Sequence, residues 1–158
     1  MNSYRIVPWE EQYHPDFFRL SLEWLEKYVS VEPADRLILQ HPHEQILDDG
    51  GEIFFLLADN VPVGTVSMIH TKENTFELAK LAVTESYKGK GLARMLMERA
   101  IEFAESREAE EILLYTNHNL SPAIGLYQKY GFEIVPLVNN KYLESDIKMR
   151  LKLKGKVG

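Results

Sequence analysis

The sequence predicts a single α/β domain built on a mixed sheet of six to seven strands flanked by about four helices. Three features of the 158-residue chain lead to this prediction. Residues 52–83 hold three dense apolar runs separated by turn signals, a pattern typical of an antiparallel meander. Residues 76–116 follow the order strand, helix, strand, which predicts a crossover between two parallel strands. Apolar residues at helical spacing over 15–29 indicate a helix that covers the sheet.

The first third of the chain is predicted to be mostly helical. A short strand is expected over 4–7, before the helix over 15–29. A second, shorter helix is expected between Pro33 and Asp48, where two aspartates followed by two glycines form a strong turn signal.

The rest of the chain alternates between apolar runs and turn residues. Strands are expected over 52–58, 63–70, 76–83, 111–116, 132–138 and 142–153, and helices over 91–105 and 122–130. Asp59 and Asn60 suit a tight hairpin turn, and Gly131 suits the position that ends the last helix. Ligands of crossover units tend to lie at the carboxyl ends of the parallel strands.

Composition narrows the classes of function. No stretch approaches the roughly 18 apolar residues needed to span a bilayer, and the first residues lack the apolar region of a signal peptide. The net charge of −6 argues against broad nucleic-acid binding. The absence of cysteine excludes disulfides, thiolate metal sites and a cysteine acyl-enzyme. We therefore expect a cytoplasmic protein without nucleic-acid or membrane partners.

A basic, glycine-rich loop separates the strand over 76–83 from the helix over 91–105. Its residues are Lys88, Gly89, Lys90, Gly91, Leu92, Ala93 and Arg94. Glycines let the backbone approach a ligand, and free N–H groups at a helix start bind anions. The three basic side chains add positive charge where phosphates would lie. From these residues alone, a glycine turn with solvated lysines is an equal alternative.

Two other phosphate-binding loops are excluded. A Walker A loop would need glycine at Thr84 and a terminal Lys-Ser/Thr pair. A dinucleotide fingerprint would need a third glycine at Arg94 and an acidic residue after the next strand, where Asn117 and Asn119 stand instead. A diphosphate held by backbone N–H groups remains compatible with the loop.

Residues 88–93 resemble the R/Q-x-x-G-x-G/A motif with which the GNAT family of N-acetyltransferases grips the pyrophosphate of coenzyme A, with Lys88 in the Arg/Gln position. Residues 78–83 resemble the family's fourth strand, and residues 121–132 its A-x-x-L-Y-x-K-x-G-F ending. The resemblance covers 76–132 and implies a GNAT fold whose fourth and fifth strands are parallel and splayed. It implies one N-acetyltransferase domain over 1–158, with a helical acceptor side (1–50), the sheet and pyrophosphate loop (51–117) and a C-terminal part (118–158).

The resemblance also implies roles for individual residues. Acetyl-CoA would be the co-substrate, with no metal, and the acetyl group would pass directly to a primary amine of a small molecule or peptide. The implied cofactor contacts are the backbone of Leu81, Ala82 and Val83, the loop from Lys88 to Arg94, Asn117 or Asn119, and Tyr127. Tyr127 would be the acid near the thioester sulfur, and the Leu81 N–H would polarise the carbonyl. Glu77 is the candidate base.

Several alternatives stay open at this stage. The base can instead be a water chain, Glu32, Asp35, Glu73 or His118. Tyr127 has a simpler interpretation as a core residue, and Glu77 as a solvent-facing one. Trp24 and Tyr28 suit the core, or an aromatic wall that receives a cationic amine. His41 and His43 flank a proline that breaks the helical spacing a metal site would need.

Two further classes of function compete with catalysis. The same fold can serve as a non-catalytic acyl-CoA sensor or interaction module, or the loop can bind another phosphorylated ligand. Exposed edge strands make a homodimer compatible with the fold.

Overall fold

The computed structural model describes residues 3–138 and 142–153, and over these residues the chain forms one seven-stranded mixed sheet. The strands are β1 (Tyr4–Pro8), β2 (Glu52–Ala58), β3 (Val61–Lys72), β4 (Thr75–Val83), β5 (Glu111–Thr116), β6 (Glu133–Val135) and β7 (Ile147–Lys152). The α-helices are α1 (His14–Tyr28), α2 (Pro33–Gln40), α3 (Pro42–Gln45), α4 (Leu92–Ser106) and α5 (Ser121–Lys129). Strand order is β1-β2-β3-β4-β5-β7-β6, and the predicted mixed sheet of six to seven strands is confirmed.

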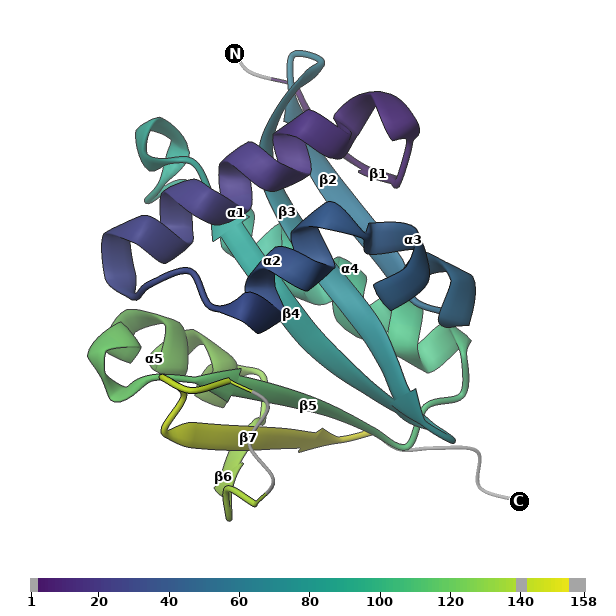
Figure 1. Ribbon diagram of the computed structural model, residues 1–158, viewed down its shortest axis with the longest axis vertical. Coiled ribbons are helices and arrows are strands. Elements are labelled where there is room, and N and C mark those ends of the chain that lie inside the picture. Colours follow the sequence, from purple (N-terminus) through teal and green to yellow (C-terminus); the bar gives the residue numbers. More distant parts are fainter. Residues whose placement is uncertain (1–2, 139–141, 154–158) are drawn as a thin grey trace.

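Helices cover both faces of this sheet. Helices α1, α2 and α3 lie on one face and α4 on the other, while α5 lies beside β5 and β7 (Figure 1). The position of β2 between two cores explains why its sequence is continuously apolar. Its alternate residues Phe54 and Leu56 join the core that contains α4, whereas Phe55 and Leu57 join the core under α1 and α2. Both faces of the strand are therefore buried.

The meander over β2, β3 and β4 is closed by tight turns. Asp59 and Asn60 both have positive φ, at 49° and 71°, which is the left-handed geometry of a type I′ hairpin. The predicted turn between β2 and β3 is thus confirmed. None of the helices in the described ranges is long and apolar enough to cross a bilayer.

Strands β4 and β5 pair only at their beginnings. The parallel register joins Thr75–Glu77 to residues 111–113, and beyond it the two strands fan apart (Figure 1). On the opposite edge of β4, a bulge places Lys80 and Leu81 across from the single residue Val66 of β3. Lys80 adopts a left-handed φ of 55°, which costs a non-glycine residue roughly 1–2 kcal/mol. The splay and the bulge together open the middle of the sheet.

The C-terminal strands are shorter than predicted. Strand β6 ends at Val135, and β7 begins only at Ile147, so residues 142–146 form a strap rather than a strand. The strap's backbone is bound outside the sheet ladder, because the N–H groups of Leu143 and Glu144 donate to the Glu32 carboxylate. A second departure from prediction is that the helix expected after Pro33 is interrupted at His41, and α3 begins at the following proline.

Candidate active site

The basic loop folds into a left-handed turn that leads directly into α4. Gly89 and Gly91 have φ values of 79° and 76°, and Gly91 is the N-cap residue of α4. A side chain at either position would meet open space, so backbone conformation rather than crowding selects glycine there. The first N–H groups of a helix have no partner within the helix, so this turn presents donors to an anion.

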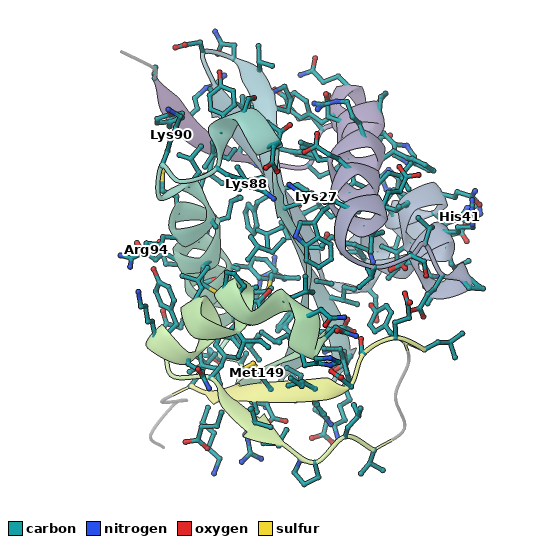
Figure 2. The ribbon with its side chains drawn as sticks, turned by 90° about the vertical axis from the view of Figure 1, so that its left-hand side faces the viewer. Lys27, His41, Lys88, Lys90, Arg94 and Met149 are labelled. Atoms are coloured by element: carbon teal, nitrogen blue, oxygen red, sulfur yellow. The ribbon has the colours of Figure 1, made fainter. Side chains whose placement is uncertain are left out.

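Basic side chains surround the start of α4. Figure 2 shows Lys88, Lys90 and Arg94 along the loop and the first turn of the helix, with Lys27 of α1 facing Lys88. Lys27 and Lys88 both pair with Glu85, at 2.6 and 3.1 Å, and hydrogen bonds from their ammonium groups lower the pKa of that carboxyl. Four basic side chains of this acidic protein therefore lie near the helix N-terminus.

A cavity of about 340 Å³ lies between this loop, β4 and α5. We call it the loop cavity. Its lining includes Leu81, Ala82, Val83, Lys88, Gly89, Gly91, Leu92, Ala93, Arg94, Asn119 and Tyr127. The family resemblance assigned all of these residues to the cofactor, and the structure brings them together around one cavity. Lys90 is exposed outside the lining, and Asn117 faces a second cavity.

The second cavity, which we call the inner cavity, has a volume of about 90 Å³ and lies between α1, α2 and the splayed ends of β4 and β5. Four residues line both cavities: Trp24, Leu81, Leu120 and Tyr127. The two cavities therefore meet at the β4 bulge and the face of α5 that carries Tyr127. The β4–β5 splay that the family resemblance implies creates this junction.

A carboxylate held by a tyrosine lies in the inner cavity. The Glu77 side chain projects from β4, is 2% exposed, and accepts a hydrogen bond of 2.8 Å from the hydroxyl of Tyr142. Burial, and then the negative charge of Glu77, raise the pKa of Tyr142 well above its ordinary value. Tyr142 therefore stays protonated and acts as the donor. The solvent-facing interpretation of Glu77 is wrong.

A buried ion pair forms another part of the inner cavity. The Lys80 ammonium contacts the Asp35 carboxylate, and the two side chains are 6% and 5% exposed. The same ammonium lies 5.4 Å from the centre of the Tyr142 ring. Asp35 also accepts a hydrogen bond of 2.9 Å from the Glu32 N–H, closing a capping box at the start of α2. Through Glu32 and Tyr142, the strap is fastened to α2 and β4.

Tyr127 lies at the junction of the two cavities and is 7% exposed. Gly131, with φ at 97°, follows the end of α5, and the Phe132 N–H donates to the Tyr127 carbonyl at 3.1 Å. This termination, predicted from Gly131, fixes the last turn of the helix. Burial raises the pKa of Tyr127 to about 12, so its hydroxyl keeps its proton at neutral pH.

Comparison with known proteins identifies the family of this chain. The family model for GNAT acetyltransferases matches residues 6–132 of the chain. The chain belongs to the GNAT family. Its resemblance over 76–132 is thus confirmed and extends toward the N-terminus. Named N-acetyltransferases among its relatives and the shared fold make the protein an acyltransferase.

Its relatives and structural neighbours agree in architecture. An uncharacterized N-acetyltransferase of Bacillus subtilis strain 168, YvbK, is 31% identical over 122 residues, which cover 75% of this chain and 79% of that protein. A GNAT acetyltransferase structure from Staphylococcus aureus Mu50 has a TM-score of 0.87 at 19% identity, covering 96% of this chain and all of the other. A putative acetyltransferase from Salmonella typhimurium with its cofactor acetyl-CoA has a TM-score of 0.76 at 17% identity, covering 99% and 98%.

The remaining candidate residues of this GNAT protein are spread more widely. Glu32 and Asp35 line the inner cavity, but Glu73 lies in the exposed turn after β3. His118 is also exposed, and its ring pairs with Asp146 outside the cavity lining. Trp24 lines both cavities, and the Tyr28 side chain lies outside the described residues. No group of three or more metal-ligating side chains occurs within 3–138 and 142–153.

Sequence reasoning gave no role to several members of the inner cavity, among them Tyr142, Lys80, Tyr115 and Glu144. Tyr142 belongs to a segment predicted as strand, and Lys80 to a strand in which a bulge carries no clear sequence signal. A signal for the first did exist, since Tyr142 is followed by Leu-Glu-Ser-Asp, a polar stretch better suited to a turn than to a covered strand.

Proposed function

We propose that this protein transfers an acetyl group from acetyl-CoA directly to a primary amine of a small molecule or peptide. The observation that carries the proposal is the meeting of two cavities of opposite character at Leu81 and Tyr127. One cavity begins at a basic helix N-terminus, and the other holds carboxylates. An anionic acyl donor and a cationic acceptor would meet where the two cavities join.

The lining of the loop cavity suits coenzyme A in its chemistry. Backbone N–H groups around Gly91 and the charges of Lys88 and Arg94 suit a pyrophosphate. Apolar lining from Val83 and Leu126 suits a flexible pantetheine arm that runs along β4. When bound there, acetyl-CoA would supply a thioester carbonyl carbon as the electrophile. The acetyl-CoA in the Salmonella structure supports the same choice of donor for this chain.

Glu77 would act as the base. An alkylammonium must lose one proton before its nitrogen can attack, and a second leaves as the amide forms. A carboxylate oriented by the Tyr142 hydroxyl can accept such a proton and return it to solvent. General base catalysis of this kind contributes about 10²- to 10⁴-fold to rate.

The Leu81 N–H would stabilise the charge that develops on the thioester carbonyl oxygen, and the Tyr127 hydroxyl the charge that develops on the sulfur. A preorganised N–H donor aimed at the carbonyl oxygen is worth roughly 3 kcal/mol of barrier. A tyrosine with a pKa of about 12 is a much weaker acid than a thiol, which ionises near about 8.5. Full proton transfer from Tyr127 to the departing sulfur is therefore uphill, and its hydroxyl serves chiefly as a hydrogen-bond donor.

The chain has no cysteine to carry an acyl group, which favours direct transfer. The test is release of free thiol from acetyl-CoA with a panel of primary amines, alongside acetyl-CoA binding by calorimetry. Glu77→Gln should lower kcat about 100-fold or more while donor binding persists. Glu73→Gln, which makes the same charge change in an exposed turn, should leave kcat unchanged. Tight donor binding without thiol release from any amine would instead identify a non-catalytic acyl-CoA-binding protein.

A further inference from the structure

The inner cavity limits what an acceptor can be, if the proposed acetyl transfer takes place at its junction with the loop cavity. Its volume of about 90 Å³ gives room for roughly six water-sized groups. Trp24, Tyr115 and Tyr142 contribute aromatic residues to its wall. Such a space suits a narrow, unbranched chain better than a sugar ring or a branched peptide backbone.

The charges of the inner cavity are strongly unequal. Among the described residues that line it, Glu32, Asp35, Glu77 and Glu144 are acidic and Lys80 is the one basic side chain. The Lys80 charge is already matched by Asp35 in the buried ion pair. An acceptor therefore meets a surplus of carboxylates, not an available ammonium group.

This surplus discriminates between amines that otherwise look alike. At about 7 Å and an effective dielectric constant of about 20, two like charges repel enough to weaken binding some 50-fold. An acceptor that carries a carboxylate would meet that repulsion inside the cavity. An ammonium group would be attracted, and the aromatic walls favour cations and methylene chains alike.

A second carboxylate lies where the cavity reaches the surface. Glu144 is exposed, and its carboxylate is fixed by the N–H and hydroxyl of Ser30 at 2.9 and 2.7 Å. Glu77, by contrast, is buried and lines the inner cavity alone, four residues before Leu81 of the junction. The cavity thus has one buried carboxylate in its interior and one exposed carboxylate at the surface.

We infer that the acceptor is an unbranched aliphatic diamine without a carboxylate. One amine would lie between Glu77 and the junction, and the second ammonium near Glu144. In the reaction the deep nitrogen forms a bond to the acetyl carbon as the carbon–sulfur bond breaks. The sulfur keeps the electron pair and ends as thiol with one of the two protons that the ammonium nitrogen loses, while the other passes through Glu77 to solvent. The inference rests on the proposed function and names its substrate class.

A matched set of substrates tests this inference. Lysine is 1,5-diaminopentane with one added carboxylate, and 1-aminopentane lacks the second ammonium. We expect kcat/KM for 1,5-diaminopentane to be at least tenfold higher than kcat/KM for lysine. It should also be several-fold higher than kcat/KM for 1-aminopentane.

Charge variants supply the structural arm of the test. Asp35→Asn leaves the Lys80 charge uncompensated and should raise the lysine-to-diamine ratio of kcat/KM at least fivefold. Asp49→Asn, the same charge change outside the cavity lining, should leave that ratio unchanged. Because Asp35 also caps α2, Glu144→Gln provides an exposed second variant. It should reduce the advantage of 1,5-diaminopentane over 1-aminopentane.

The outcomes separate the inference from the function beneath it. If wild-type protein acetylates lysine as fast as the diamine, or if both cavity variants leave the ratios unchanged, the diamine inference is wrong although acetyl transfer stands. If the protein binds acetyl-CoA and acetylates none of the amines, the proposed function itself is overturned. A preference for the diamine that shifts in both variants supports the inference.

Discussion

Replacing Tyr127 by phenylalanine should change how the protein responds to alkali. The pKa of Tyr127 is about 12 in the folded chain because the ring is buried, whereas an exposed tyrosine in the unfolded chain ionises near about 10. Between these values the unfolded chain has lost a proton that the folded chain still binds, so stability must fall as pH rises. The full effect is about 3 kcal/mol, and about 2 kcal/mol is lost by a pH of about 11.5.

Urea unfolding of wild-type protein and Tyr127→Phe, each at pH 8 and at about pH 11.5, measures this effect. Phenylalanine has no proton to lose, so the free energy of unfolding of the variant should fall about 2 kcal/mol less than that of wild type. Other alkaline losses are common to both proteins and cancel in the difference. If both lose the same stability, the buried, proton-retaining state assigned to Tyr127 is wrong, and with it its role as a hydrogen-bond donor at neutral pH.

Three other predictions concern the loop and the core. Gly91→Ala should lower the free energy of unfolding by about 1–2 kcal/mol, because it forces a side chain into a left-handed φ, and it should also weaken coenzyme A binding. The control Gly125→Ala in α5 should leave thermal stability unchanged or slightly higher in a melting experiment. Lys88→Ala should weaken coenzyme A binding several-fold in calorimetry, and the difference should shrink at high salt; a salt-independent difference would contradict an electrostatic role. Leu96→Ala, in the core, should lower the free energy of unfolding by about 2–5 kcal/mol. Leu143→Ala, at a residue 85% exposed, should change it by less than about 0.5 kcal/mol. Equal losses in the two variants would contradict the assignment of Leu96 to the core.

The loop cavity was largely predictable from sequence because its signals are local. Glycines at left-handed positions, basic residues beside a helix start and a strand before it all occur within about twenty residues of one another. Hairpin and helix-end signals at Asn60 and Gly131 are local in the same way. Such features depend on backbone conformation, which the residue type itself restricts.

The inner cavity depends on contacts between distant segments, and these left little trace in the sequence. Glu32 holds the strap through residues more than a hundred positions away, and Glu77 meets Tyr142 across 65 positions. The Lys80 bulge arises from a register shift against β3, not from a glycine or proline. The family resemblance could therefore identify Glu77 as a candidate but not the pairings that surround it.

The most direct test of acetyl transfer at the cavity junction is a single-turnover experiment with acetyl-CoA, excess protein and 1,5-diaminopentane, quenched over time and followed by mass spectrometry. Acetylated diamine and free coenzyme A should appear together, in equal amounts and at one rate, while the mass of the protein stays unchanged. An acetylated protein that forms before the product, or coenzyme A released without acetylated amine, would contradict direct transfer.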